Sequence, residues 1–310
     1  MKPMKFALAT PGMLNYPASM APWERESGGA EILRFAKVAD RQSWQWLTVP
    51  EHVLMPTDMC EMMGSRFPEG VAACAVLAGA TERIHLLTYV LVLPYRHPLM
   101  LAKQISTIEF LAGGRFTLGT APGHLEREFE ALGVPFKERG KLTDEYLQVL
   151  KQCWTADEPA FSGNYTEFEG IVMDPKPVQK PHPPIFIGGN TKIAMRRAVE
   201  HGDGWIPWLI THQELAECLQ YIREQPGFEE KKDNFEILVP TTQYQVEDYS
   251  HRETADTRID SGRDDVMREI ERLQKAGATT AQVMPPKVET FEQCLEWLEW
   301  FNTDIIPNFS

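Results

Sequence analysis

The sequence lacks several features that would assign a chain to a class at once. No two of its five cysteines form a CxxC pair, and an odd number of scattered cysteines argues against a disulfide scaffold or a zinc knuckle. No apolar run approaches the roughly 20 residues of a membrane span. The first residues, MKPMKFALATPG, have no long apolar core after the lysines, so they are not expected to be a signal peptide. We therefore expect reduced thiols and a cytoplasmic protein.

Positive charge is also scarce. The 310 residues include 31 basic and 44 acidic side chains, which gives a net charge of −13. Such a charge repels nucleic acid and anionic membranes, so neither is expected as a partner. An anionic ligand must then be bound by a local site.

The short motifs of several enzyme classes are missing as well. There is no GxGxxG, no GxxxxGKS/T loop and no GxSxG elbow. His52 and His124 do not have the HExxH spacing, so we expect no metal site. A metal-free isomerase or aldolase is a further alternative, but it would need a lysine or paired acids at strand ends. The predicted strands provide neither.

What the sequence does contain is a regular alternation of strands and helices. Eight segments of strand composition are each followed by a helical segment. The strands are predicted at residues 5–10, 46–49, 84–93, 115–120, 185–187, 204–208, 235–246 and 280–284. Strict alternation requires parallel strands joined by right-handed crossovers. Eight units favour closure, so we predict an α/β fold, a (β/α)₈ TIM barrel, with residues 1–310 as a single domain.

Two long connections interrupt this pattern. Residues 155–184 contain six prolines and two glycines around a predicted hairpin, and we interpret them as an excursion between strands four and five. Residues 53–68 are predicted to be irregular and carry four methionines. Methionines suit an adaptable wall, so this segment is expected to cover a substrate pocket; the alternative is a loop packed on the core.

The stretch PHPPIFIGGNTKIAMRRAVEHGDGWIP, residues 181–207, is the best candidate for binding an anion. A buried strand ends at Gly188 and Gly189, and Asn190 or Thr191 can cap the helix that follows. Glycines let a ligand approach the backbone, and the N–H groups of a first helical turn have no intrahelical partners. The alternative is an ordinary strand-to-helix turn.

Several pieces of the chain are similar to one family. Leu101 to Leu150 contains LAKQISTIEFLAGGRFTLGTAPGHLEREFEALGVPF and then ERGKLTDEYLQVL. This region resembles the luciferase-like family of flavin- and deazaflavin-dependent oxidoreductases. VPEH, LTYVLVLPYRHP, PHPPIFIGG and GDGWIP agree with it and occur in the family's order.

The resemblance implies a luciferase-like barrel with the flavin lying across the strand ends. It implies that His52 faces the reactive edge of the ring and donates or accepts a proton there. Tyr89 and Val90 fall at a strand-three bulge that supports the ring, and in deazaflavin-using members this peptide bond is often cis. The residues implied to hold the cofactor phosphate are Gly188, Gly189, Asn190 and Thr191.

Four more strand-end residues are predicted to contact the cofactor: Glu51, Gly119, Thr120 and His124. At His124 the chain departs from the family, where tryptophan is common and one sugar-phosphate dehydrogenase branch has glutamate. VPEH and IFIGG are slightly more similar to the deazaflavin branch.

The resemblance implies reduced deazaflavin F-420 acting by hydride transfer on a small organic substrate. One alternative is a monooxygenase that uses reduced FMN, inserts oxygen from a flavin hydroperoxide and works with a flavin reductase. A non-catalytic relative that sequesters flavin is another. Relatives are often dimers, so a homodimer is the assembly to test.

Overall fold

The computed structural model describes residues 3–17, 19–241 and 262–309. Its main sheet runs in the order β3-β2-β1-β11-β10-β9-β8-β5-β4, and a further β3–β5 pairing closes it into a barrel. Every printed pairing in this sheet is parallel. The strands are β1 (Lys5–Ala9), β2 (Trp46–Val49), β3 (His85–Thr88), β4 (Leu91–Val92), β5 (Phe116–Ala121), β8 (Ile185–Gly188), β9 (Gly204–Ile206), β10 (Glu236–Pro240) and β11 (Thr280–Val283). β3 and β4 share one position in the wall, so the nine strands occupy eight positions. The predicted (β/α)₈ barrel is therefore confirmed.

The third position differs from the prediction of one continuous strand over residues 84–93. β3 and β4 are separated by Tyr89 and Val90, whose peptide bond is cis, one of the two geometries that the resemblance left open for this chain. Beside this break, the Thr88 hydroxyl donates to the Gly119 carbonyl at 2.8 Å. Only glycine fits at position 119, because a Cβ there would lie 2.0 Å from the Thr88 carbonyl oxygen.

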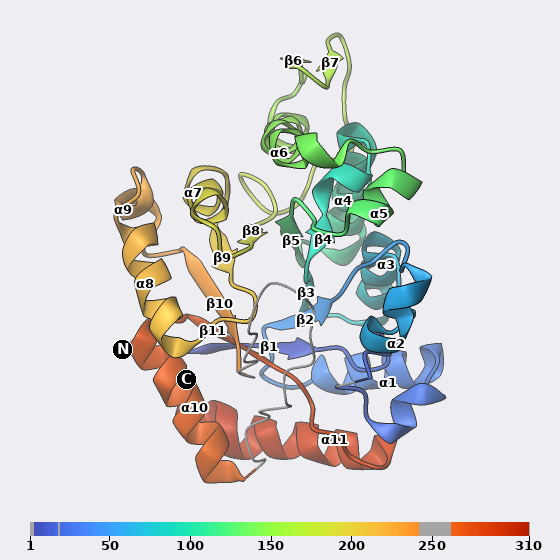
Figure 1. Cartoon of the computed structure of the whole chain (residues 1–310), viewed down its shortest axis with the longest axis vertical. Coiled ribbons are helices and arrows are strands. Elements are labelled where there is room, and N and C mark those ends of the chain that lie inside the picture. Colours follow the sequence, from blue (N-terminus) through green and yellow to red (C-terminus); the bar gives the residue numbers. More distant parts are fainter. Residues whose placement is uncertain (1–2, 18, 242–261, 310) are drawn as a thin grey trace.

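Helices surround the barrel (Figure 1). The longer ones are α1 (Gly29–Ala39), α3 (Gly70–Ala80), α4 (Pro98–Ala112), α6 (Arg139–Thr155), α7 (Lys192–His201), α8 (His212–Arg223), α10 (Arg263–Ala276) and α11 (Phe291–Trp300). The shorter ones are α2 (Cys60–Met63), α5 (Glu126–Ala131) and α9 (Phe228–Lys231).

Two connections show how the units of the barrel are joined. The first follows α1, which ends at Ala39. The carboxylate of Asp40, the next residue, accepts hydrogen bonds from the amides of Glu82, Arg83 and Ile84. Residues 53–68 are not wholly irregular, because they contain a short 3-10 turn and α2. Of the predicted strand 235–246, residues 242–246 lie outside the described residues.

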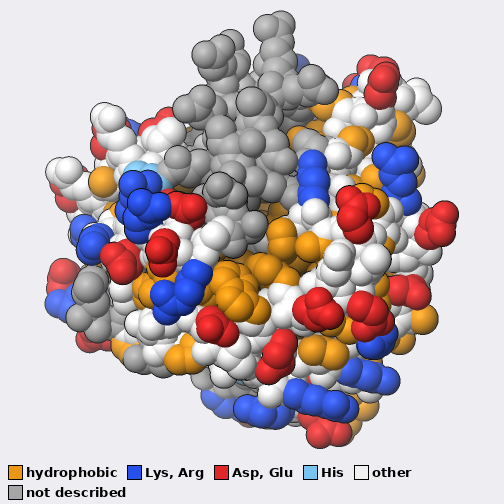
Figure 2. All heavy atoms as spheres, turned by 90° about the horizontal axis from the view of Figure 1, so that it is seen from below, with side chains coloured by type: hydrophobic (Ala, Val, Ile, Leu, Met, Phe, Trp, Pro, Cys, Tyr) orange, Lys and Arg blue, Asp and Glu red, His pale blue; other side chains and the backbone are white. Residues whose placement is uncertain are grey.

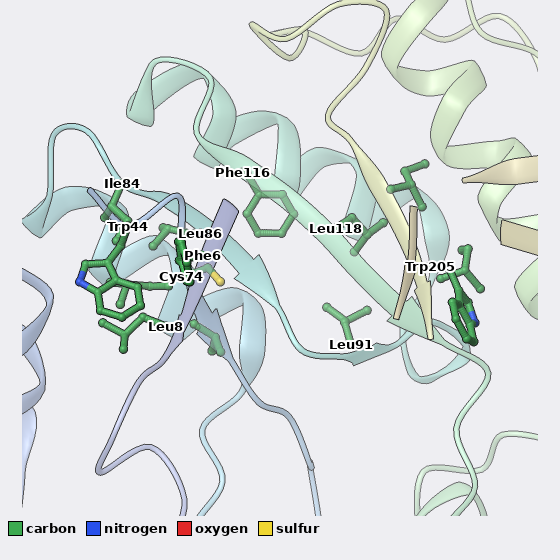
Figure 3. Packing of buried hydrophobic residues seen from close by; sticks show 14 of the residues in the cluster. Phe6, Leu8, Trp44, Cys74, Ile84, Leu86, Leu91, Phe116, Leu118 and Trp205 are labelled. Carbon is green, nitrogen blue, oxygen red and sulfur yellow. The ribbon is translucent and has the colours of Figure 1, made fainter. Parts of the chain in front are cut away.

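The core lies on both sides of the barrel wall. Between wall and helices, Figure 3 shows Phe6, Leu86, Phe116 and Leu118 among the buried side chains that pack together. Inside the barrel a separate cluster comprises Ala7, Trp46, Leu87, Phe186, Ile206 and Leu238. The Trp46 indole donates to the Thr117 hydroxyl at 3.1 Å. Since side chains fill the interior, a ligand must lie over the strand ends.

The excursion projects from the barrel as a small hairpin (Figure 1). β6 (Phe161–Ser162) and β7 (Glu167–Phe168) pair antiparallel, so the predicted hairpin is confirmed. The buried Glu145 carboxylate on α6 accepts hydrogen bonds from the amides of Asn164 and Tyr165, which ties the turn to the helix.

The two ends of the described chain meet at one edge of the barrel, where the Met4 amide donates to the Phe309 carbonyl at 2.9 Å. Figure 2 shows a face on which acidic and basic side chains are interspersed and apolar side chains gather near the centre. Within the described ranges, no helix combines the length and apolar character needed to cross a membrane.

Candidate active site

Most of the predicted site residues meet at one end of the barrel, because parallel strands place their carboxyl ends together. The rings of His52 and His124 lie 6.0 Å apart, centroid to centroid. Tyr89 and Val90 are half-buried and pack on the cluster inside the barrel. A Cβ at Gly188 would lie 3.5 Å from the Val90 side chain. These residues therefore line one mouth.

His52 lies just beyond the end of β2 and is held by a residue that the sequence did not single out. Its Nδ1 is 3.1 Å from Oε2 of Glu128 on α5. Phe67 contacts the imidazole edge-to-face, with ring centroids 4.7 Å apart. The His52 side chain keeps 13% of its surface exposed, whereas that of Glu128 is fully buried. His52 is thus fixed, yet one part of its ring stays accessible.

The Glu128 carboxylate joins three segments. Its Oε1 accepts from the amides of Val53 at 2.6 Å and Leu54 at 2.9 Å. Its Oε2 accepts from the Tyr95 hydroxyl at 2.8 Å, in addition to its contact with His52. Burial alone would raise the pKa of Glu128, but these hydrogen bonds and the neighbouring His52 lower the pKa below its ordinary value. The pKa of Tyr95 is raised, first by burial and then by Glu128.

A signal for Glu128 was present in the sequence. The segment Leu125 to Phe129 places an acidic residue beside two apolar residues that are both buried in the structure. A charged side chain on the buried face of a helix needs a partner. The sequence alone does not name that partner, because His52 lies 76 positions earlier in the chain.

Glu51 is bonded to the protein on both carboxylate oxygens. It accepts from the Gly70 amide at 3.0 Å, where α3 begins, and from the Val92 amide at 3.1 Å in β4. It also forms an ion pair with Arg96, which pairs with Glu69 as well. Glu51 thus links the ends of β2 and β4 to the start of α3, and its contact with a cofactor stays a prediction.

Thr120 and Gly119 of β5 form hydrogen bonds to β4 and β3, the two strands that share the third position in the wall. The buried Thr120 hydroxyl donates to the Leu91 carbonyl at 2.8 Å. The Gly119 amide donates to the Thr88 hydroxyl at 3.0 Å. His124, further along the same connection, is exposed beside His52.

The turn from β8 to α7 has the glycine geometry that the sequence predicts. Gly189 has a φ of +119°, a conformation that side chains disfavour. Its amide, however, donates to the Ile206 carbonyl at 3.0 Å and is engaged within the fold. Thr191 caps α7 by accepting from the Ala194 amide at 3.1 Å. The donors suited to an anion are therefore those of the first turn of α7, starting at Lys192.

Asn190 connects this turn to the end of β9. Its side-chain oxygen accepts from the Trp208 amide at 2.8 Å, and its side-chain nitrogen donates to the Trp208 carbonyl. The Trp205 indole donates to the Gly189 carbonyl at 2.7 Å. Of the basic residues nearby, Arg197 is buried and pairs with Asp144 on α6, so it is turned away from the turn.

The methionine-rich segment lies on the same side as His52. It begins with the Val53 and Leu54 amides bound by Glu128, and Asp58 forms an ion pair with Arg127 on α5. That this segment covers a substrate stays a prediction. In the described part of the chain, no group of three or more His, Cys, Asp or Glu residues is arranged to hold a metal ion.

Comparison with known proteins gives a consistent result. Residues 5–282 match the family described as luciferase-like monooxygenase. An uncharacterised protein of Mycobacterium tuberculosis is 31% identical over 219 residues, which are 66% of this chain and 74% of that protein. An FMNH2-dependent dimethylsulfone monooxygenase of Pseudomonas putida is 34% identical over 155 residues, 49% of this chain and 41% of that enzyme.

A solved structure has the same fold. The coenzyme F-420-dependent tetrahydromethanopterin reductase of Methanopyrus kandleri superposes with a TM-score of 0.75 at 17% identity. The match covers 100% of this chain and 99% of that chain.

Proposed function

Because the chain belongs to the luciferase-like monooxygenase family, we propose that it is an oxidoreductase that transfers a hydride between deazaflavin F-420 and a small organic substrate. The observation that carries this proposal is His52, which lies at the strand ends with one nitrogen bonded to a buried carboxylate. A histidine in this position can supply or remove the proton that accompanies hydride transfer.

The residues at the mouth fit a flat cofactor with a phosphate. Tyr89 and Val90 offer a half-buried apolar surface above the filled barrel interior. The first turn of α7, beginning at Lys192, offers backbone donors to an anion. When bound, the reduced cofactor supplies the hydride. The protein positions it, excludes water and places His52 beside the reaction.

A second candidate is a monooxygenase that uses reduced FMN. The 34% identity to FMNH2-dependent dimethylsulfone monooxygenase favours it. The similarity of VPEH and IFIGG to the deazaflavin branch favours F-420. If FMN is the cofactor, a flavin reductase must supply it in reduced form.

The two cofactors are distinguished by titrating the purified protein with each, in reduced form, under air and under argon. The proposal expects absorbance changes that show binding of F-420, and oxidation of F-420 that depends on substrate but not on oxygen. Tight binding of FMN with no measurable affinity for F-420 would end the preference for F-420. Retention of cofactor without any turnover would favour the flavin-sequestering alternative.

Two further expectations belong with this proposal. None of the five cysteines is paired in a disulfide, and we propose a cytoplasmic location. We also propose a homodimer, as the resemblance implies. Sedimentation equilibrium at several protein concentrations tests this directly, and a monomer mass throughout would rule the dimer out.

A further inference from the structure

The hydrogen bonds around Glu128 limit which nitrogen of the His52 imidazole can carry a proton. Two of the four contacts to the carboxylate come from the main-chain amides of Val53 and Leu54, and an amide N–H can only donate. Both bonds reach Oε1, so this oxygen is an acceptor. Tyr95 and His52 share Oε2.

We propose that Glu128 is a positioning residue that holds neutral His52 in one tautomer, with the proton on Nδ1 and an unprotonated Nε2. An ionised carboxylate has no proton to give, so the imidazole nitrogen that contacts it must be the donor. In a neutral imidazole the second nitrogen then carries a lone pair. This inference rests on the proposed function of His52 and goes beyond it by naming the nitrogen that acts.

The consequence is that Nε2 is the nitrogen of His52 that is available for proton exchange. Neutral His52 accepts a proton there, and the imidazolium that forms gives the proton back from the same nitrogen. The Glu128 carboxylate stabilises the imidazolium, because its Oε2 accepts from Nδ1 in both forms of the ring.

Other charged groups around the pair are already engaged or lie further out. Tyr95 shares the same carboxylate, and the pKa of its hydroxyl is raised, so it stays neutral. Glu51 and Arg96 form an ion pair, and both act electrostatically on Tyr95. Arg127, next to Glu128 in sequence, pairs with Asp58. The ring of His124 lies beside the His52 ring, with the centroids 6.0 Å apart.

The test is Glu128→Gln, which preserves shape but changes the hydrogen-bonding pattern. The amide oxygen can still accept from Val53 and Leu54, while the amide nitrogen replaces Oε2 and donates toward Nδ1. His52 must then carry its proton on Nε2. We expect ¹⁵N NMR of histidine-labelled protein to show this reversal, and substrate-dependent oxidation of reduced F-420 to fall about a hundredfold, the scale of lost acid–base assistance.

The matched control is Glu130→Gln, because Glu130 is an exposed acid on the same helix. It should change neither the ¹⁵N signature nor turnover. Tyr95→Phe removes the other donor to Oε2 and should leave the His52 tautomer unchanged. Each variant is first checked for the wild-type circular dichroism spectrum.

A wild-type tautomer in a folded Glu128→Gln protein overturns the inference, as does reversal of the tautomer with unchanged turnover. If Glu128→Gln does not fold, the wild-type protein decides alone, and a proton on Nε2 of neutral His52 rejects the proposal. The absence of turnover in the wild-type protein with either cofactor contradicts the proposed function instead. The ¹⁵N signature still reports on Glu128 in that case.

Discussion

At the scale of single residues, the candidate site depends on side chains whose orientation the fold already fixes. His52 has one nitrogen bonded to Glu128 and one edge against Phe67, so its ring has little freedom to reorient. Restricting a catalytic group in this way lowers the entropy that must be lost during reaction.

His52→Ala should therefore lower turnover by about a hundredfold or more, with a smaller effect on cofactor affinity. The reason is that the proposed proton transfer is lost while the proposed phosphate site at α7 is untouched. Steady-state kinetics and cofactor titration on the same preparation measure both effects. Wild-type turnover in this variant would make His52 a structural residue.

Gly189→Val should abolish cofactor binding while the barrel stays folded. A valine is strained at a φ of +119°, and its Cβ would lie 3.2 Å from the Ala194 Cβ in the first turn of α7. The turn must then move away from the site. Gly170→Val is a suitable control, because Gly170 also has a positive φ but lies in the excursion with open space around it. Normal binding in a folded Gly189→Val protein would contradict the proposed phosphate position.

At the scale of elements, the connections at the opposite end of the barrel hold helices and strands in register. Asp40 follows α1 and binds three amides just before β3, so it joins two neighbouring units. Burial alone would raise its pKa, but the three amides and the charge of Arg115 lower the pKa below the ordinary value.

Asp40→Asn should destabilise the protein by about 1–2 kcal/mol near neutral pH, because charge-assisted hydrogen bonds are lost. A lowered folded-state pKa gives stability that is fully present above the unfolded-state value, about 3.9. That stability is lost as the pH falls through the lower folded-state pKa. The difference between wild type and variant, from urea unfolding at several pH values, should thus shrink below about pH 4. A difference that grows on acidification would refute this account.

At the scale of the whole molecule, closure makes the barrel one unit. β1 pairs with both β2 and β11, so the first and last strands support each other. Among the described strands of the barrel, β4 pairs with β5 alone, and each of the others pairs with a neighbour on both sides. The excursion has only a two-residue pairing of its own and depends on Glu145 of α6.

Thermal unfolding should therefore show one transition, with the same midpoint by far-UV circular dichroism and by tryptophan fluorescence. Trp46 inside the barrel and Trp154 on α6, which donates to the Ala102 carbonyl, report on separate regions. Two resolved transitions would mean that the chain contains more than one folding unit, contrary to the predicted single domain.

The sequence by itself determined the barrel and the place of the site within it. Strand composition, helix periodicity and the glycines after Ile187 are local properties, and strict alternation leaves parallel strands as the only simple arrangement. The positions of His52 and Gly188 at one mouth follow from that order, whereas the bulge at Tyr89 and Val90 was implied by the resemblance.

Tertiary structure decided which groups are available for chemistry. Glu128 meets His52 across 76 positions, and the Ile206 carbonyl takes the Gly189 amide that the sequence offered to a phosphate. Glu51 and Asn190, both predicted to face the cofactor, are bonded to Arg96 and to the Trp208 backbone. A residue's type shows what it can donate or accept. Only the closed barrel brings these groups to hydrogen-bond partners that are distant in sequence. The distances between such partners are set by strand register and packing, and no local sequence pattern records them.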